Sequence, residues 1–379
     1  MDFKFSEEQE IFRRMVSQFA KNELAPLIDE LEEKDELPVE IMRKMGELGF
    51  FGILYPEKYG GSNGDVITFC ILIEEISYIS AAVAGITNIQ LNGVASPVFI
   101  FGTEEQKKRF LIPSIKGEKI GAIAMTEPNA GSDAASIRTS AKKDGNDYII
   151  NGSKIFCSNG GAADLFFLTA VTDPGKRGKG ISLFIIERGT PGFTVSKNIK
   201  KLGAHGVGTY ELIFEDCRIP SDNLLGEENK GFYNLMKTVE RNRIGVTAMA
   251  VGLARAAFDE ALKYAKEREQ FGQPIGNFQG IQFKLADMAM ELELATTMLY
   301  KAAWMDSEGM RCNKEASIAK LFASEMVNRI AYQALQIHGG YGYMLEYPVQ
   351  RYFRDARLFE IFEGTSEIQR IIISREIGL

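Results

Sequence analysis

Apolar residues recur at three- and four-residue spacing through the first third of the chain, which places them on one face of each helix they form. Two such series are Phe12, Met15, Phe19 and Ile41, Met45, Leu48. Ser6 and Gln9 have the spacing of a capping box, which begins a helix. Thr103 and Gln106 repeat that spacing. We therefore expect an amino-terminal helical domain over residues 1–120.

The hydrophobic period shortens after residue 120, where short β-rich runs are separated by Gly, Asn, Asp and Pro. These runs lie at 148–150, 155–157, 165–171, 181–186 and 211–214. Between the first two runs, Asn151-Gly152 is the signature of a two-residue hairpin turn, because both turn positions need positive φ. The pattern predicts a β domain over residues 121–228.

Helical periodicity returns near residue 229 and continues to the end of the chain. Its long segments lie at 233–268, at 278–307, at 313–337 and from about Ser366. Lengths of this order are typical of a bundle, so we expect a carboxy-terminal four-helix bundle over residues 229–379. Strands do not alternate with helices and no GxGxxG follows a strand, which disfavours a doubly wound dinucleotide-binding sheet. The expected fold class is α+β, in the order helical, β, helical.

The composition is that of a folded globular protein, with 45% hydrophobic and 25% charged residues among 379. The chain has 44 Lys and Arg residues against 51 Asp and Glu residues, a formal net charge of -7. This negative charge argues against nucleic acid as a partner. Four scattered cysteines and two histidines suggest neither a disulfide framework nor a metal centre. No apolar leader opens the chain, and the most apolar stretch, 66–76, is interrupted by Glu74 and Glu75. We expect a cytoplasmic protein that is not inserted in a membrane.

Three segments are candidate ligand contacts, and each also has an ordinary structural interpretation. The loop 126–133, Thr-Glu-Pro-Asn-Ala-Gly-Ser-Asp, is either a plain turn or a loop that presents backbone N–H groups and hydroxyls to a ligand. Arg268, at a helix end, either compensates the helix dipole or binds a phosphate. The segment 336–340, Gln-Ile-His-Gly-Gly, either caps a helix or lets a ligand approach the backbone closely.

Glu363 is the most informative carboxylate in the sequence. It follows an apolar set at 358–362 and precedes Gly364, after which Ser366 and Gln369 are spaced as a capping box. An acid near a helix N-terminus is a common stabilising arrangement. Alternatively, the apolar neighbours raise the pKa of this carboxyl, which is what a general base working near neutral pH needs.

The chain carries six motifs that are informative in combination. They are Met-Thr-Glu-Pro-Asn-Ala-Gly-Ser-Asp at 125–133, Asn-Gly-Ser-Lys-Ile-Phe-Cys-Ser-Asn-Gly at 151–160, Arg-Glu-Gln-Phe-Gly at 268–272, Gln-Ile-His-Gly-Gly at 336–340, Arg-Asp-Ala-Arg at 354–357 and Glu-Gly-Thr-Ser at 363–366. In this order and spacing the sequence resembles the acyl-CoA dehydrogenase family, in its short- and medium-chain-like subgroup, over essentially the whole chain. The resemblance implies an FAD-dependent oxidoreductase of fatty acid metabolism. Such an enzyme converts an acyl-CoA thioester to the 2-enoyl-CoA by α-proton abstraction and hydride transfer from the β-carbon to flavin N5.

The same resemblance places FAD between the β domain and the carboxy-terminal bundle. Contacts with flavin or substrate are expected from Met125, Thr126, Gly131, Ser132, Phe156, Cys157 and Ser158. Contacts with the pyrophosphate and adenosine of an FAD bound to a neighbouring subunit are expected from Arg268, Phe271, Gln279, Gln336, Gly339 and Gly340. Adenosine contacts are expected from Thr365 and Glu367. Shared sites imply an oligomer, in this family a homotetramer. Cys157 departs from the isoleucine usual there, and either alters the flavin or serves as a small apolar substitute.

Glu363 is, by resemblance, the base that removes the α-proton, and its backbone N–H with a flavin ribityl hydroxyl would stabilise the enolate oxygen. Some relatives carry their base on the first bundle helix, but Asn242 occupies that position here and an amide cannot be the base. Substrate contacts are expected from Ser132, Glu240, Arg241, Asn242, Arg243 and Gly364. The two arginines are expected to meet pantetheine or phosphate groups, with surface ion pairing as the alternative.

The absence of a nicotinamide motif suggests an electron-transferring flavoprotein as the electron acceptor. Two other functions keep most of these motifs. One is a flavin acyl-CoA oxidase on the same fold, and the other is a non-catalytic acyl-CoA-binding flavoprotein, which Glu363 argues against. The acyl group itself depends on cavity-lining residues that the sequence does not identify.

Overall fold

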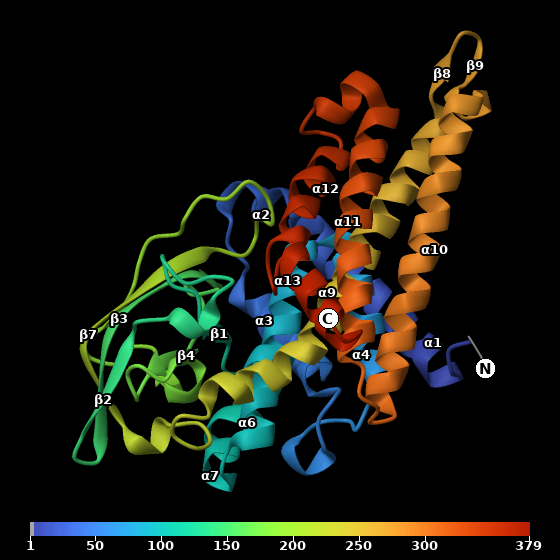
Figure 1. Ribbon diagram of the computed structural model, residues 1–379. Helices are drawn as coiled ribbons and strands as arrows, with labels where there is room; N and C mark the ends of the chain where they lie inside the picture. Colours follow the sequence, from blue (N-terminus) through green and yellow to red (C-terminus); the bar gives the residue numbers. More distant parts are fainter. Residues whose placement is uncertain (1–3) are drawn as a thin grey trace.

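The computed structural model describes residues 4–379, apart from the side chain of Glu240. Figure 1 shows three regions, with helices in blue to cyan, a sheet in green and long helices in yellow to red. The amino-terminal helices end at Ile115, the main sheet spans Gly121 to Pro220, and helices resume at Gly231. This order confirms the α+β fold class expected from the sequence.

The amino-terminal region consists of helices and the turns that join them. Its helices are α1 (Glu7–Phe19), α2 (Ile28–Lys34), α3 (Val39–Glu47), α4 (Val66–Ile79), α5 (Ala81–Asn88), α6 (Ser96–Phe101), α7 (Glu104–Gln106) and α8 (Ile112–Ile115). At the start of α1 the Ser6 hydroxyl accepts the Gln9 N–H, and the Gln9 side chain accepts the Ser6 N–H. Thr103 and Gln106 do the same before α7, so both predicted capping boxes are confirmed.

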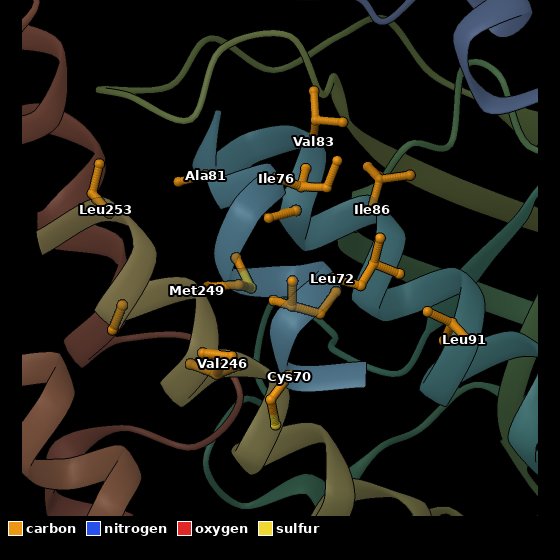
Figure 2. Close-up of a cluster of buried hydrophobic side chains, with 14 of the residues drawn as sticks. Cys70, Leu72, Ile76, Ala81, Val83, Ile86, Leu91, Val246, Met249 and Leu253 are labelled. Atoms are coloured by element: carbon orange, nitrogen blue, oxygen red, sulfur yellow. The ribbon is translucent and has the colours of Figure 1, made fainter. Parts of the chain in front are cut away.

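Helix α4 lies at the centre of the largest hydrophobic core, because apolar residues occupy most of its circumference. Figure 2 shows side chains of α4, α5 and the turn after α5 in one buried cluster with Val246, Met249 and Leu253 of α9 (Gly231–Glu267). The acids Glu74 and Glu75 of α4 are also buried, and the Arg255 guanidinium of α9 binds both. The same helix therefore holds the amino- and carboxy-terminal regions together through apolar packing and a buried ion network.

A second apolar run, Ala81–Phe101, joins α5, a π-helical turn (Ile89–Ala95) and α6 into one continuous helical segment. By length and composition alone its 21 residues could cross a membrane, but 78% of its apolar window is buried inside the protein. It is packed as a core helix.

The main sheet has the strand order β1-β4-β2-β3-β7-β6, with β5 paired to β4. Its strands are β1 (Gly121–Ala124), β2 (Ser140–Asp144), β3 (Asp147–Ser158), β4 (Leu165–Val171), β5 (Ile181–Glu187), β6 (Phe193–Val195) and β7 (Thr209–Pro220). β1 runs parallel to β4 with Gly121 opposite Leu165, whereas β3 is antiparallel to β7 with Asp147 opposite Pro220. The carboxyl end of β1 leads directly into the loop that carries Met125 and Thr126.

The predicted hairpin at Asn151-Gly152 is wrong, because both residues lie inside the long strand β3. Gly152, at φ 139°, sits where the register against β7 shifts, and a Cβ there would lie 2.8 Å from Thr139. The Asn151 side chain accepts the backbone N–H of Asp216 on β7, which secures this bulge. The actual hairpin turns at Gly145, between β2 and β3.

The carboxy-terminal region contains α9, α10 (Gln279–Ser307) and α11 (Asn313–His338) side by side, with the short strands β8 (Glu269–Gln270) and β9 (Gln273–Pro274) projecting beyond α10 in Figure 1. The shorter helices are α12 (Val349–Ala356) and α13 (Ser366–Glu376), and α13 packs on α11. The predicted capping box at Ser366 and Gln369 is wrong by one residue. Thr365 is the N-cap, and its hydroxyl accepts the Ile368 N–H.

Candidate active site

Glu363 lies in the segment between α12 and α13, at a point where the backbone turns sharply. Its φ is 53° and that of Gly364 is 88°, so two successive residues have left-handed conformations. The φ of Gly364 would strain any other residue, and a Cβ there would also lie 2.6 Å from Gln369 Nε2, so glycine is favoured at this position. A glutamate in this conformation is strained by about 1–3 kcal/mol, and such residues gather at functional sites.

The Glu363 carboxylate accepts a hydrogen bond from the Asn242 side chain of α9, from Nδ2 to Oε2 at 2.6 Å. Burial raises the pKa of Glu363 above 4.5, while the hydrogen bond from Asn242 and the charges of Lys320 and Arg243 oppose the rise. The raised pKa agrees with the expectation from its apolar neighbours. A carboxylate in this environment is a candidate general base.

Lys320 of α11 holds the Glu363 segment in place. Its fully buried ammonium donates to the carbonyl oxygens of Phe359 at 2.8 Å and Gly364 at 2.7 Å. Burial lowers the pKa of Lys320 to about 8, and the negative charge of Glu363 opposes the fall. One side chain therefore closes both ends of the turn that presents the base.

The other substrate candidates on α9 have partners within the protein. Arg241 binds Asp306 at 2.7 Å, and Arg243, which is buried, donates to Asn313 at 2.7 Å. The Arg241 guanidinium thus forms an ion pair within the protein, which is the alternative to contact with pantetheine or phosphate. The backbone of Glu240 is part of α9, but its side chain lies outside the described part of the structure.

The flavin candidates of the β domain come together at one place. The Ile155 N–H donates to the Thr126 carbonyl oxygen at 2.9 Å, which joins the loop after β1 to the middle of β3. Phe156 is 62% exposed and has φ 58°, so a strained aromatic residue faces outward beside that loop. Ser132 is exposed, and a Cβ on Gly131 would meet no atom within 4 Å. An open loop next to an exposed ring fits a planar cofactor such as flavin.

A buried ion pair supports this loop from beneath. Lys154, with no exposed surface, donates to Glu127 at 2.8 Å and to the Met125 carbonyl oxygen at 3.1 Å. Glu127 also accepts the backbone N–H groups of Arg138 and Thr139. Burial opposes ionisation of Glu127, but Lys154 and these donors outweigh it and lower its pKa. Within the motif at 125–133, Glu127 therefore acts by holding the loop in place.

Cys157 faces the other way. Its side chain is 1% exposed in the β-domain core, and its thiol donates to the Ile123 carbonyl oxygen at 3.3 Å. Burial raises the pKa of Cys157 to about 12, so the thiol stays protonated. The structure thus favours the small apolar role, and only the backbone of Cys157 remains available to a cofactor. Ser158, the next residue, is half-buried opposite Thr209.

Six further candidates lie at the opposite end of the bundle. They are Arg268, Phe271, Gln279, Gln336, Gly339 and Gly340, of which Arg268 is half-buried and the others are exposed. The Arg268 guanidinium lies over the Tyr341 ring at 5.4 Å, so the β8–β9 hairpin and the end of α11 are neighbours. Gln336 is about 24 Å along α11 from Lys320, at ~1.5 Å per residue. This set is therefore separated from the base of its own chain and points outward.

Thr365 and Glu367 lie immediately after the base. The Thr365 hydroxyl caps α13, and Glu367 is exposed in its first turn. The cap leaves the Thr365 side chain committed to the helix, whereas Glu367 faces solvent. Their expected contact with the adenosine of FAD stays a prediction.

The base and the flavin candidates are linked through the turn Ile89–Ala95. On one side of it the Asn88 side chain donates to Asn242, the partner of Glu363, at 2.5 Å. On the other side, a Cβ on Gly93 would lie 2.2 Å from the Ile123 side chain of β1. The roles of Asn88, Lys320 and Lys154 have no local signal in the sequence, because they depend on partners far along the chain. Among residues 4–379, no group of three His, Cys, Asp or Glu side chains could hold a metal ion.

Comparison with known proteins covers nearly the whole chain. Three family profiles match: "Acyl-CoA dehydrogenase, N-terminal domain" over residues 6–118, "middle domain" over 122–217 and "C-terminal domain" over 229–378. The chain is 46% identical to the short-chain specific acyl-CoA dehydrogenase of Clostridium acetobutylicum, covering 100% of both. It is 45% identical to the caffeyl-CoA reductase-Etf complex subunit CarC of Acetobacterium woodii, covering 98% of both. The solved butyryl-CoA dehydrogenase of Megasphaera elsdenii matches with a TM-score of 0.97 and 44% identity, covering 100% of both chains.

Proposed function

Since this chain belongs to the acyl-CoA dehydrogenase family, an oxidoreductase family that depends on FAD, we propose that it oxidises a short acyl-CoA thioester to the 2-enoyl-CoA with FAD as its cofactor. Two relatives support the short acyl group, since one is named short-chain specific and the other a butyryl-CoA dehydrogenase. The observation that carries the proposal is the strained, partly buried Glu363 beside Asn242.

Glu363 removes the proton from the α-carbon of the thioester. Its raised pKa makes it a stronger base than an exposed carboxylate, and Gly364 next to it leaves room for the substrate. The Glu363 backbone N–H is the proposed protein donor to the enolate oxygen. Lys320 and Asn242 fix the backbone and the carboxylate respectively, so the base is preorganised before the substrate enters.

Bound at this site, FAD would supply the redox chemistry, as the acceptor for the hydride from the β-carbon. The flavin would lie beside β1, held by Met125, Thr126, Gly131, Ser132, Phe156 and the backbone at 157–158. Arg268 and its neighbours at the far end of the bundle would hold the adenosine half of an FAD that belongs to another subunit. Sites shared in this way would require an oligomer, and we propose a homotetramer. The free, buried cysteines are in keeping with a cytoplasmic location, and we propose a role in fatty acid metabolism.

We propose an electron-transferring flavoprotein as the electron acceptor, in keeping with the relative named as part of an Etf complex. The same relative is a reductase, so reduction of an enoyl-CoA is the second candidate function. The residues that bind, orient and protonate are the same in both directions. The direction depends on the acceptor and on the potential of the bound flavin, which redox titration measures.

Anaerobic titration of the purified protein tests the proposal. The preparation should be yellow, with flavin near one per chain, and butyryl-CoA should bleach it faster than octanoyl-, isovaleryl- or glutaryl-CoA. A colourless protein that cannot be reconstituted with FAD contradicts the cofactor. A yellow protein that no acyl-CoA bleaches indicates a non-catalytic binder, and rapid peroxide formation with substrate in air indicates an oxidase.

A further inference from the structure

We propose that Asn92, Asn88 and Asn242 form a relay of amide groups that orients the Glu363 carboxylate and favours its ionised form. The three asparagines are positioning residues, and their role rests on the proposed function of Glu363 as the base. Of the three, only Asn242 lies in a segment that the sequence singled out, and there as an expected substrate contact. The asparagines come from three elements of the fold. Asn92 and Asn88 belong to the π-helical turn and the end of α5, and Asn242 to α9.

The hydrogen bonds form one continuous chain. The Asn92 side chain donates from Nδ2 to Asn88 Oδ1 at 2.9 Å. Asn88 donates from Nδ2 to Asn242 Oδ1 at 2.5 Å, and Asn242 donates from Nδ2 to Glu363 Oε2 at 2.6 Å. The asparagines are 1%, 2% and 3% exposed, so the two bonds between them are buried, and the third bond ends at the partly buried Glu363.

The charge of Glu363 sets the direction of the whole chain. An ionised carboxylate can only accept, so Asn242 must turn its NH₂ group toward it. The Asn242 oxygen then faces Asn88 and needs a donor, and the Asn88 oxygen in turn needs a donor from Asn92. Bonds aligned in this way polarise one another, so the outer amides strengthen the inner one.

The surrounding structure is shaped to hold these amides. A Cβ on Gly245, three residues after Asn242 in α9, would lie 2.3 Å from Asn88 Oδ1. Glycine at this position therefore makes room for the Asn88 side chain. The π-helical turn Ile89–Ala95 adds a residue to the helix where Asn88 and Asn92 meet, and such turns are common at functional sites.

The relay acts together with the charges that face Glu363. These are Lys320 of α11 and Arg243 of α9, and both favour the carboxylate. The relay differs from them because it adds no charge and has a defined direction. Its loss should leave both cations in place and weaken only the donor at Glu363 Oε2.

The test is the Asn88→Leu variant, which keeps side-chain size and does not touch Glu363. Without the donor from residue 88, the Asn242 oxygen is left unpaired and no longer strengthens the bond from Asn242 to Glu363, so the carboxylate becomes harder to ionise. In the FAD-loaded protein, anaerobic bleaching by acyl-CoA should show its acidic limb at higher pH. At a pH below that limb the rate should fall about tenfold, the effect of losing one charge-assisted hydrogen bond. The rate at high pH should change little.

A second measurement is independent of turnover. Infrared titration of the protein without substrate follows the carboxyl band that disappears in Glu363→Gln, and in Asn88→Leu this band should titrate at higher pH. Thr87→Val is the matched control, because it removes a buried hydroxyl one residue away that bonds only to Val83. Asn92→Leu should move both readouts in the same direction by less, and it carries the test if Asn88→Leu does not fold.

The outcomes separate the relay from the proposed function. If both readouts of Asn88→Leu match those of the wild type, the relay is refuted. If Thr87→Val moves them equally, the effect is general loosening and the relay is again refuted. If no acyl-CoA bleaches the wild type, the proposed function fails, and the infrared titration alone decides whether the amides control Glu363.

Discussion

The Lys320 ammonium donates a hydrogen bond to the carbonyl oxygen of Gly364, which joins the middle of α11 to the residue after Glu363. A second bond from the same group reaches Phe359, so the turn that presents the carboxylate is closed from inside the bundle. The strain at Glu363 is sustained by this closure, because the left-handed backbone has a fixed anchor on either side.

Replacing Lys320 by Met should loosen the base without removing it. Two buried carbonyl groups lose their donor, which should lower the free energy of unfolding by about 2–4 kcal/mol. A base displaced by ~1 Å should also remove the α-proton less effectively, so acyl-CoA should bleach the flavin ~10²-fold more slowly. Lys314→Met, at the exposed start of the same helix, is the control. Thermal unfolding and stopped-flow bleaching check both effects, and a Lys320→Met enzyme with unchanged kinetics would contradict the anchoring role.

Replacing Glu363 by Gln should abolish the proton transfer while it preserves binding. The amide is the same size but cannot accept the α-proton, so bleaching should fall ~10²–10⁴-fold or more. FAD content and acyl-CoA affinity, measured by absorbance and by equilibrium binding, should stay close to those of the wild type. A near wild-type bleaching rate would mean that another residue is the base.

The Lys154–Glu127 pair should make retention of FAD sensitive to acid. The pKa of Glu127 is lowered in the folded protein, so its stabilising contribution is complete above its ordinary value of 4.5 and is lost as pH falls through the lower folded value. Lys154→Met leaves a buried, unpaired carboxylate and should destabilise the protein by ~3–5 kcal/mol. Adding Glu127→Gln to that variant should restore part of the loss.

Flavin release on acidification measures this pair directly. The wild type should release FAD more steeply below about pH 4.5 than the double variant does, because the double variant has no charge to lose there. Equal acid sensitivity in the two proteins would place the acid-labile interaction elsewhere.

Replacing Arg268 by Ala should weaken FAD retention more than it weakens folding. Its guanidinium lies at the end of the bundle remote from Glu363 of the same chain, so the expected defect is in the site of a neighbouring subunit. Lys266→Ala, exposed in the last turn of α9, is the control. Dialysis with flavin absorbance, together with the mass in solution, tests the idea. A monomer with full FAD occupancy would refute it.

Local signals in the sequence were sufficient where a feature depends on neighbours within a few residues. The caps at Ser6 and Thr103 and the desolvated surroundings of Glu363 are of this kind. Asn151-Gly152 misled because Gly152 has a positive φ beside the register shift between β3 and β7, as a residue of a hairpin turn does. For Cys157 the sequence left two roles open, and the structure favours the small apolar one because it buries the side chain between exposed Phe156 and half-buried Ser158.

The residues that position the base could not be predicted from the sequence. Asn88 and Asn242 are 154 residues apart, and Asn242 and Glu363 are 121 apart. An asparagine in a helix carries no local mark of a distant partner. Lys320 likewise reads as an ordinary helical lysine until α13 and the turn before it are folded over its head group.

The apolar segment Ala81–Phe101 has a consequence for synthesis of the protein. Its cover includes α9, whose Val246, Met249 and Leu253 face the cluster in Figure 2. About 145 residues separate the end of the segment from that cover, so at ~5–20 residues per second a ribosome needs roughly 7–30 s to complete it. During this interval a stretch with the length and hydropathy of a membrane span is without its final packing partner. Because exposed apolar surface promotes aggregation, this is the stage of synthesis at which the nascent chain most needs a chaperone.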